Sequence, residues 1–591
     1  MPKDSDSELP TGGAAEAAVR DWLAAFDAAL AAGDADAAAA LFAEDSHWRD
    51  VLAFDWDLTT TSGRDAVRAR VSERLAAIAP TNFCLNEDRY PPRPVMRAGV
   101  DCLEAFVRFD TSGGACEGVV RLVPAEGGGF ACWVLMTALR EIAGHGELLG
   151  FARPGGDAFS REWGGDNWLD IRERARAYAD HDPTALVVGG GQAGLAAAAR
   201  LTHLGIDTLI VDGEDRIGDN WRKRYHSLVL HNEVQVNHMP YMPFPPTWPV
   251  YIPKDLLANW FEHYVEALEL NFWTGTRLAG GAYDEAARAW EVTLEKTDGT
   301  RRVMRPRHVV LATGVSAIPI MPDLPGLSVF KGTVMHSGAY TEGHAWKGKR
   351  ALVFGTGNSA HDVAHDLWAS GVDVTMVQRA STHIVSLAEA QKPYAIYNEG
   401  PSVDDCDLLA MASPFPVLRE GYRIMTAASK LADKPLLDAL EARGFRLNDG
   451  VEDCGFQMSY LQRGGGYYFN VGASDLIAEG RIKVLDYADI ATFTADGIRL
   501  NDGAALGADL VICATGFKSL QDTARVLFGD GVADRIGPVW GFGDDGELRN
   551  MWRPTPQPGL WFIAGSLAQC RIYSKVLALQ IKAREAGLTG R

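Results

Sequence analysis

The sequence predicts an α/β protein in which two similar strand–loop–helix–strand units follow a smaller α+β domain. Three observations lead to this fold class. Helical periodicity gives way to alternating apolar residues in the N-terminal part of the chain, and a glycine-rich loop after a short β-type run occurs near residue 189 and again near residue 355. Strands that alternate with helices form parallel sheets. The length of 591 residues is sufficient for these three folded units.

Composition and charge exclude several classes of protein. Apolar residues make up 47% of the chain and charged residues 23%, which is typical of a globular protein. The net charge of -20 repels phosphate backbones and anionic lipids, so we expect neither nucleic-acid nor membrane partners. The polar start of the chain and the absence of an apolar run of about 18 residues predict a cytoplasmic protein. The 8 scattered cysteines contain no CxxC pair, and we expect them to be reduced.

The N-terminal domain is predicted to span residues 14–145, after a polar, disordered tail at residues 1–13. Its first helix is marked by apolar residues at helical spacing, namely Val19, Trp22, Leu23, Phe26 and Leu30. Alternating residues from Leu103 to Phe109, followed by further β-type runs, predict a sheet. Residues 146–183 are rich in Gly, Asp and Arg and are predicted to be a linker with one short helix.

Two segments of this domain resemble a known fold. The order of helices before strands, with the runs LFAEDSHWRD and SGRDAV, resembles the SnoaL-like cone fold. A cone-like domain could bind a small hydrophobic molecule through Trp48, Asp50 and Trp56. It could equally serve a structural role, such as mediating the contacts of a homodimer.

A first dinucleotide-binding signature lies between the β-type run Ala185–Val188 and the acidic end of the next such run. It comprises a GxGxxG loop, an Ala-rich helix and a terminal acid, and the residues expected to contact the cofactor are Gly189, Gly191, Gln192, Gly194 and Asp212. The glycines allow a tight turn, close approach of a pyrophosphate and close packing of helix on strand. The helix N-terminus favours the phosphates, and Asp212 is placed to bind a ribose hydroxyl.

The same pattern returns in the second half of the chain. The loop residues expected to contact the second cofactor are Gly355, Gly357, Asn358 and Ser359. Gln378 stands at the same offset from Gly355 as Asp212 from Gly189, so an amide replaces the carboxylate. A carboxylate would repel a 2′-phosphate, whereas Gln378 with Arg379 and Ser381 could bind it. The second site is therefore predicted to hold NADPH.

Two dinucleotide sites in one chain indicate electron transfer, in which NADPH delivers hydride and a flavin accepts it. We therefore predict two Rossmann-like domains, with FAD in the first. Two β-type runs near the C-terminus, each followed by a glycine (Gly516 and Gly565), are expected to close over the flavin. The predicted division is an FAD-binding part at residues 184–342, an NADP-binding domain at residues 343–508 and a second FAD-binding part at residues 509–591.

A further motif connects the two predicted domains. Phe330, Gly332, His336 and Tyr340 fit FxGxxxHxxxY, and over residues 180–591 the chain resembles the flavin-containing monooxygenases. The runs HSGAY and GKRALVFGTGNSAHDVAHDL resemble most the YUCCA-type branch and its microbial relatives. Tyr340 stands where the related Baeyer–Villiger monooxygenases have Trp, which disfavours that branch. We expect His336 and Tyr340 to shape the crossing between the domains.

The resemblance implies a reaction and further site residues. NADPH would reduce the flavin, which with O₂ would form a C4a-hydroperoxide and oxygenate a small substrate at an N or S centre, or decarboxylate a 2-oxo acid such as indole-3-pyruvate. Near the flavin we expect Trp221 to pack against the ring. His231 and Asn232 are the candidate catalytic residues, offering hydrogen bonds to the bound peroxide. For Trp221 and His231 a purely structural role remains the alternative.

Two alternatives to this reading stay open. The chain could be a redox-sensing protein that binds FAD and NADP without oxygenase turnover. A flavin disulfide reductase is disfavoured because it needs a CxxC pair, and no spacing typical of a metal site occurs either. A helical insertion at residues 386–466 could form the roof of a substrate pocket or merely pack on the periphery.

Overall fold

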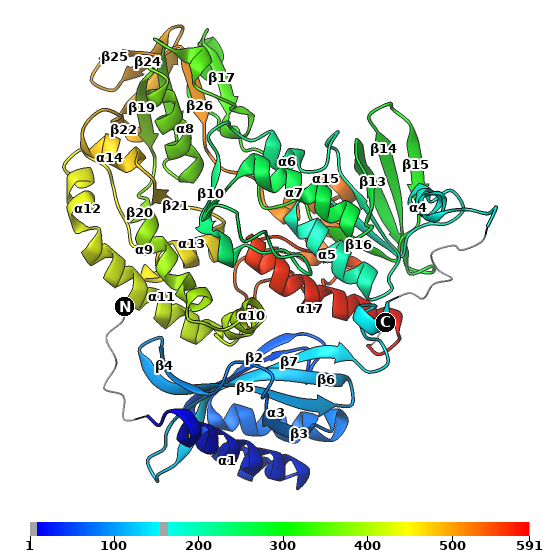
Figure 1. The fold of residues 1–591 in the computed structure, drawn as a ribbon. Helices are drawn as coiled ribbons and strands as arrows, with labels where there is room; N and C mark the ends of the chain where they lie inside the picture. The colour runs from blue at the N-terminus through cyan, green and yellow to red at the C-terminus, as the bar shows by residue number, and fades with distance from the viewer. Residues whose placement is uncertain (1–8, 154–162, 590–591) are drawn as a thin grey trace.

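The computed structural model describes residues 9–153 and 163–589. Figure 1 shows the N-terminal domain below the two glycine-loop units. The C-terminal helix α17 (Leu567–Glu585) lies between that domain and the first of these units. Part of the predicted tail lies outside the described residues. Gly12 and Gly13, which were expected to belong to this tail, are already part of the first helix.

The N-terminal domain is a mostly antiparallel sheet packed against helices, as predicted. The helices are α1 (Gly12–Ala31), α2 (Ala35–Ala40) and α3 (Arg64–Ile78). The sheet order is β2-β1-β7-β6-β5-β3, with β4 paired to β5. The strands are β1 (Phe42–Val51), β2 (Leu58–Ser62), β3 (Thr81–Leu85), β4 (Arg93–Arg97), β5 (Val100–Thr111), β6 (Gly114–Pro124) and β7 (Phe130–Ile142).

An aromatic cluster fills the space between α1 and this sheet. Trp22 stacks on Phe26 with ring centroids 5.0 Å apart, and Phe26 packs edge-on against Trp48. Trp48 and Asp50 have no exposed surface, and Asp50 accepts a 2.5 Å hydrogen bond from the Thr137 hydroxyl. Because both side chains are used inside the domain, the packing favours the structural alternative over a ligand pocket at these two residues.

Five parallel strands form the sheet of the first glycine-loop unit, in the order β12-β9-β8-β16-β27. The strands are β8 (Ala185–Val188), β9 (Thr208–Val211), β12 (Asn271–Trp273), β16 (His308–Leu311) and β27 (Leu560–Phe562). Strands β8, β9, β16 and β27 are buried along their whole length, which explains their continuous apolar runs. Helix α5 (Gln192–His203) packs against α17, so the end of the chain completes this unit.

Shorter elements are attached to the first sheet. They are α4 (Trp168–Ala177) in the predicted linker, α6 (Asp219–Arg222), β10 (Val229–Glu233), β11 (Tyr251–Pro253), α7 (Lys254–Ala267), β13 (Thr276–Asp284), β14 (Ala289–Lys296), β15 (Arg301–Met304), α15 (Leu520–Phe528) and α16 (Asp530–Ile536). Strands β13–β15 form an antiparallel sheet, and α15 packs on β13.

The second glycine-loop unit repeats the architecture with the strand order β17-β26-β18-β19-β22. Its main elements are β17 (Thr333–His336), β18 (Arg350–Phe354), α8 (Asn358–Ala369), β19 (Asp373–Gln378), α14 (Ala473–Ala478), β22 (Lys483–Asp486) and β26 (Leu510–Cys513). A three-stranded sheet of β23 (Ile490–Thr494), β24 (Gly497–Leu500) and β25 (Ala505–Gly507) packs beside it.

The sheet pairing moves two domain boundaries. Strands β17 and β26 were predicted to belong to the FAD-binding parts, but both lie in the second sheet, where β26 pairs in parallel with β17 and β18. The predicted boundaries at residues 342 and 508 are therefore each displaced by one strand. The reason is topological, because β26 fills the position between two strands that precede it in the chain, and no local sequence pattern specifies that partner.

The helical insertion leaves the second unit after β19 and lies above the N-terminal domain (Figure 1). It comprises β20 (His383–Ser386), α9 (Leu387–Gln391), the 3₁₀ helix η7 (Lys392–Asn398), α10 (Val403–Met411), α11 (Phe415–Ala432), α12 (Lys434–Glu441), α13 (Gly455–Arg463) and β21 (Tyr467–Asn470). Strands β20 and β21 pair in parallel. Helix α10 contacts both η7 and β6 of the N-terminal domain.

The N-terminal domain is fixed to the rest of the chain. A continuous apolar core runs from α1 through the first sheet to α17. Buried or half-buried ion pairs cross the same boundary, among them Arg49 with Glu547 at 2.7 Å and Arg89 with Asp405 at 2.6 Å. Among the described residues, no helix is long and apolar enough to cross a bilayer. All eight cysteines are free thiols, and seven of them are buried.

Candidate functional site

Three cavities meet between the two glycine-loop units. The first-loop cavity of about 600 Å³ lies at Gly189–Ala193, and the second-loop cavity of about 1000 Å³ lies at Gly355–Ala360. A central cavity of about 790 Å³ shares Gln192, Trp221 and Gly565 with the first and shares Asn358 with the second. The central cavity therefore adjoins both loop cavities.

The first loop requires glycine at the positions that the sequence indicates. Gly189 has φ +109°, and a Cβ there would lie 2.5 Å from the Ala312 carbonyl oxygen. A Cβ on Gly194 would lie 1.9 Å from the Gly189 oxygen, so Gly194 packs the helix on the loop without lining the cavity. Gly191 caps α5, whose first amide groups face the cavity.

Asp212 directly follows β9 and lines the first-loop cavity. Its carboxylate accepts hydrogen bonds from the Gly190 amide at 2.5 Å and from the Glu214 amide at 2.8 Å. Burial raises the pKa of Asp212 above its ordinary value, and these backbone hydrogen bonds oppose that shift. The carboxylate is thus fixed beside the loop, as expected for a group that binds a ribose.

Gln192, Trp221 and Gly565 connect the first-loop and central cavities. The Trp221 indole nitrogen donates to the Gln192 amide oxygen at 3.2 Å, and the Gln192 amide donates to the Gly565 carbonyl at 3.3 Å. These three predicted cofactor residues therefore form one hydrogen-bonded wall, contributed by α5, α6 and the segment that precedes α17.

The second loop repeats the geometry of the first. Gly355 has φ +117°, and a Cβ there would lie 2.4 Å from the Ala514 oxygen. A Cβ on Gly357 would have the Tyr467 backbone oxygen, 3.7 Å away, as its nearest neighbour, so the loop is open on its cavity side. Asn358 accepts a 3.0 Å hydrogen bond from the Phe469 amide, and both Asn358 and Ser359 line the second-loop cavity.

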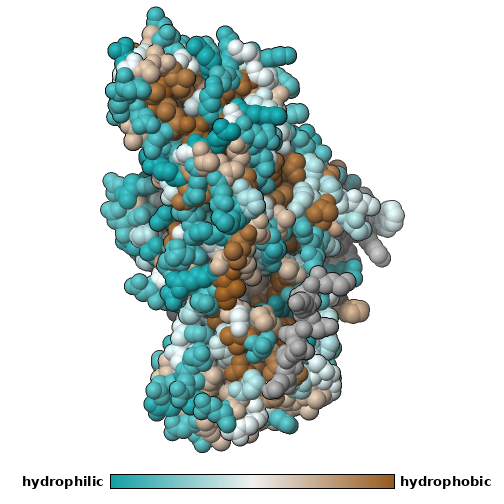
Figure 2. All heavy atoms as spheres, turned by 90° about the vertical axis from the view of Figure 1, so that its left-hand side faces the viewer, coloured by the Kyte–Doolittle hydropathy of each residue, from teal (hydrophilic) through white to brown (hydrophobic). Residues whose placement is uncertain are grey.

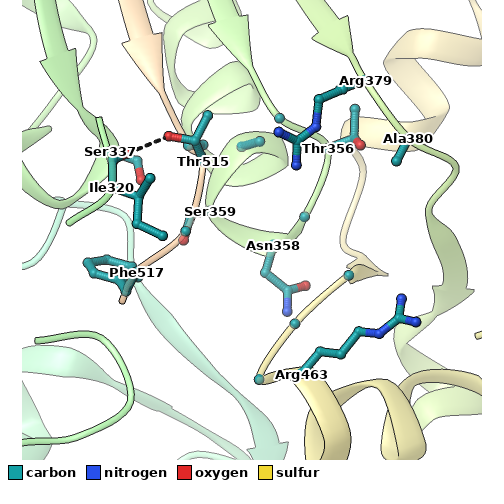
Figure 3. A pocket seen from close by; sticks show the side chains of 18 of the residues that line it. Ile320, Ser337, Thr356, Asn358, Ser359, Arg379, Ala380, Arg463, Thr515 and Phe517 are labelled. Carbon is teal, nitrogen blue, oxygen red and sulfur yellow. Dashed lines mark hydrogen bonds between the residues drawn. The ribbon is translucent and has the colours of Figure 1, made fainter. Parts of the chain in front are cut away.

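The second-loop cavity carries unpaired positive charge. Arg379, Arg463 and Lys518 line it, and none of them forms an ion pair with another described residue. In Figure 3, Arg379 and Arg463 lie on separate segments on either side of Asn358. Anionic phosphates favour such surroundings. The sequence reasoning missed Arg463 and Lys518, although each adjoins a glycine-containing loop, GGG at residues 464–466 and ATG at residues 514–516.

One predicted residue of the second site, Gln378, lies away from the cavity that Arg379 lines. Gln378 is 1% exposed and does not line the cavity, because its side-chain oxygen accepts from the Arg446 amide and its nitrogen donates to the Arg446 carbonyl. Ser381 does line the cavity, and its hydroxyl accepts a hydrogen bond from Asn448. The amide at position 378 thus anchors the segment around residue 446 in the structure.

Gly516 lies beside the second-loop cavity, although the sequence reasoning expected this segment to close over the flavin. It follows β26, which belongs to the second sheet. The Gly516 carbonyl contacts the His336 ring nitrogen Nε2 at 3.0 Å, and Tyr340 donates a 2.5 Å hydrogen bond to Asp366. His336 and Tyr340 therefore hold β17, and the segment that follows it, against the other elements of the second unit.

The candidate catalytic residues His231 and Asn232 lie on β10 and line the central cavity together. Burial lowers the pKa of His231 below its ordinary value, while Asp362, 4.0 Å from its Nε2, opposes that shift. The His231 ring packs edge-on against Phe469 at 5.5 Å. His231 is therefore neutral at pH 7 and borders the same space as Trp221 and Gln192.

Comparisons with known proteins agree with this geometry. A family described as pyridine nucleotide-disulphide oxidoreductase matches residues 186–393. The chain is 29% identical to the indole-3-pyruvate monooxygenase YUCCA1 of Oryza sativa subsp. japonica, covering 59% of this chain and 82% of that protein. It is 30% identical to the probable indole-3-pyruvate monooxygenase YUCCA8 of Arabidopsis thaliana, covering 56% of this chain and 74% of that protein.

A solved structure shares the fold. Cyclohexanone monooxygenase with bound ε-caprolactone aligns with a TM-score of 0.50 at 20% identity, covering 69% of this chain and 89% of that chain. The chain belongs to the flavin monooxygenase family that includes the YUCCA-type enzymes. The predicted class, a flavin-dependent monooxygenase that uses FAD and NADPH, is thereby confirmed.

Proposed function

We propose that this protein uses NADPH and O₂ to oxygenate a small organic substrate in the central cavity. One observation carries the proposal: the central cavity shares lining residues with both loop cavities. Hydride transfer needs two cofactors to approach each other, and oxygen transfer needs a substrate beside the flavin. The meeting point of the three cavities provides a place for both.

The residues present fit the two cofactors. A Cβ on Gly189 or Gly355 would clash with a carbonyl oxygen, so each loop has the close backbone approach of this motif, and Gly357 leaves the second loop open toward its cavity. Asp212 would hold the ribose of FAD, and Arg379 with Arg463 would hold the phosphates of NADPH. Bound FAD would accept hydride from NADPH, and in its reduced form it would activate O₂ for transfer to the substrate.

The chain's own side chains would position the reactants and exclude water. We assign to neutral His231 and to Asn232 hydrogen bonds to the reacting oxygen, because both lie in the central cavity. Trp221, held by Gln192, would pack beside the flavin ring. The insertion and the N-terminal domain also line this cavity, and their cover would limit access of water to the reaction.

The substrate class has two candidates, a soft N or S centre and a 2-oxo acid. The second is supported by the curated relatives, which are named indole-3-pyruvate monooxygenases. A panel of sulfides, amines and 2-oxo acids separates the two by mass spectrometry of the products. Sulfides and amines would gain one oxygen atom, whereas a 2-oxo acid would lose CO₂ and gain one oxygen atom, which gives the carboxylic acid shorter by one carbon.

Purified protein tests the proposal directly. We expect bound FAD, NADPH oxidation that consumes O₂, and one oxygenated product per NADPH for the correct substrate. Bound FAD without O₂-dependent NADPH oxidation, across the whole panel, would contradict the proposal and support the redox-sensing alternative. A control in anaerobic buffer should show flavin reduction that stops after one equivalent.

A further inference from the structure

The N-terminal domain contributes part of the wall of the central cavity. Arg49 on β1, Arg121 on β6 and the segment Met96–Ala98 at the turn between β4 and β5 line the same space as His231. This domain lies outside the part of the chain that the pyridine nucleotide family matches, residues 186–393. A wall from a different domain suggests a role in substrate selection.

The arginines of this wall are structural. Arg49 forms two hydrogen bonds to the Glu547 carboxylate, at 2.8 Å and 2.7 Å. Arg121 pairs with Glu104 at 3.0 Å, and Arg97 pairs with Glu104 at 2.8 Å. Arg97 also pairs with Glu399 of the insertion at 3.0 Å, so each of the three guanidinium groups is engaged by a carboxylate, and the Arg49 and Arg97 pairs hold the two parts of the chain together. The turn between β4 and β5 is thereby held against the insertion.

Opposite that turn lies α11, which carries a glycine in its interior. Glycine inside a helix costs about 1 kcal/mol relative to alanine, so it calls for a local reason. A Cβ on Gly421 would lie 3.6 Å from the Ala98 Cβ, which is ordinary contact, and Gly421 lines the central cavity. The helix and the turn therefore lie in contact at this glycine, and a longer side chain there would extend into the part of the cavity that Gly421 lines.

The cavity reaches the molecular surface at this approach. Met96 beside the turn is 59% exposed and Met425 on α11 is 39% exposed, and both line the cavity. Ile424, next to Met425, is 44% exposed. Figure 2 shows hydrophobic surface where the N-terminal lobe meets the body of the molecule. Apolar side chains at a mouth favour passage of an apolar ligand.

We propose that the β4–β5 turn and α11 flank the entrance of the substrate cavity and that the absence of a side chain at Gly421 leaves the space that limits the size of the substrate admitted. One side of this entrance belongs to the N-terminal domain, which thus contributes to size selection in the reaction proposed above, on which this inference rests. The occupant of the entrance is the small organic substrate of that reaction, whose apolar part passes these side chains on its way to the flavin.

Gly421→Leu tests the entrance, with Ala428→Leu as the matched control, because Ala428 is exposed on the same helix and does not line the cavity. We expect Gly421→Leu to lower kcat/KM at least tenfold for the bulkiest substrate that the wild type oxygenates. For the smallest substrate the change should stay within twofold, with kcat unchanged. Ala428→Leu should match the wild type for both substrates.

A binding measurement makes the test independent of turnover. N-phenyl-1-naphthylamine is a neutral aromatic probe whose fluorescence rises in apolar surroundings. We expect it to bind the wild type and to bind Gly421→Leu at least tenfold more weakly. If Gly421→Leu fails to fold, Gly421→Ala, whose Cβ makes only ordinary contact, should shift both readouts in the same direction by a smaller factor.

Two outcomes would overturn the inference. The first is Gly421→Leu binding the probe and processing the bulkiest substrate within twofold of the wild type. The second is an equal loss for small and large substrates, since that would show a general defect instead of a size limit. If the wild type oxygenates nothing but the probe result holds, the proposed function fails while the entrance stands.

Discussion

The two glycine loops allow a comparison within one chain. Gly189 and Gly355 begin them with φ of +109° and +117°, and α5 and α8 each start three residues later. Asp212 directly follows the strand after the helix in the first unit, and Gln378 is the last residue of the corresponding strand in the second. The next residue is Gly213 or Arg379, respectively. We therefore propose that the loop backbone binds a dinucleotide in both units and that the residues at the end of the second strand distinguish which one.

The structure refines this comparison at Gln378. Asp212 lines its cavity, whereas Gln378 turns away to the backbone of Arg446 and leaves Arg379 to line the cavity instead. Replacement of a carboxylate removes repulsion of a phosphate, even where the replacing side chain makes no contact with it. A further difference lies inside the helices, where Leu195 of α5 corresponds to the buried His361 of α8.

The largest effects are expected from valine substitutions in the two loops, because each should abolish the function of one loop and leave the other intact. Gly191→Val should abolish retention of FAD, because a side chain there points at Asn220, with Cβ 2.9 Å from its Nδ2, and blocks the approach of the pyrophosphate. Gly357→Val is the matched variant in the second loop. It should retain FAD, measured by the absorbance of the purified protein, but lose reduction by NADPH. Retention of FAD by Gly191→Val would reverse the order of the two sites.

His361 is expected to make the second unit sensitive to acid. Burial lowers its pKa from 6.5 to about 4, and its ring stacks on Tyr468 at 3.9 Å. Between these pH values the unfolded chain binds a proton that the folded chain does not. The free energy of unfolding should therefore fall as pH drops from 6.5 to 4, by about 3 kcal/mol for this group.

Urea unfolding at several pH values measures this effect. His361→Leu, which copies the residue of the first unit, should remove about that much of the pH dependence between pH 6.5 and pH 4. Identical pH profiles for the variant and the wild type would show that His361 is not the group responsible.

Unpaired arginines at the second-loop cavity are expected to select NADPH over NADH. The double variant Arg379→Ala, Arg463→Ala should raise the KM for NADPH at least tenfold, which corresponds to about 1.4 kcal/mol, and change the KM for NADH less than twofold. Arg499→Ala is the control, because Arg499 is exposed on β24 of the same unit and does not line the cavity. Equal effects on both nucleotides would contradict the assignment.

The smallest effect is expected at Gln378. Gln378→Ala removes two hydrogen bonds to the Arg446 backbone, so we expect the free energy of unfolding to fall by about 1 kcal/mol. The ratio of KM values for NADPH and NADH should not change, because the side chain does not line the cavity. A changed ratio would mean that Gln378 contacts the nucleotide after all.

Much of the site was predictable because its signals are local. A glycine at positive φ, a helix that begins beside it and a strand of four to six apolar residues are each encoded within a few residues of Gly189 or Gly355. The loop residues proposed to bind the cofactors were predicted for this reason. Arg463 and Lys518 were missed because neither belongs to the repeated pattern, and only the folded chain brings them to the second cavity.

The sequence by itself determined two dinucleotide-binding units, the charge difference between them and the class of enzyme, because short-range backbone constraints carry that information. Tertiary structure alone decided which sheet receives β26, which way Gln378 points and that the N-terminal domain forms a wall of the central cavity. These features depend on pairing between segments that are far apart in the chain, from 68 residues for Gln378 and Arg446 to 498 residues for Arg49 and Glu547. The free energy of such pairing comes from the packing of the whole chain, and no local pattern encodes it.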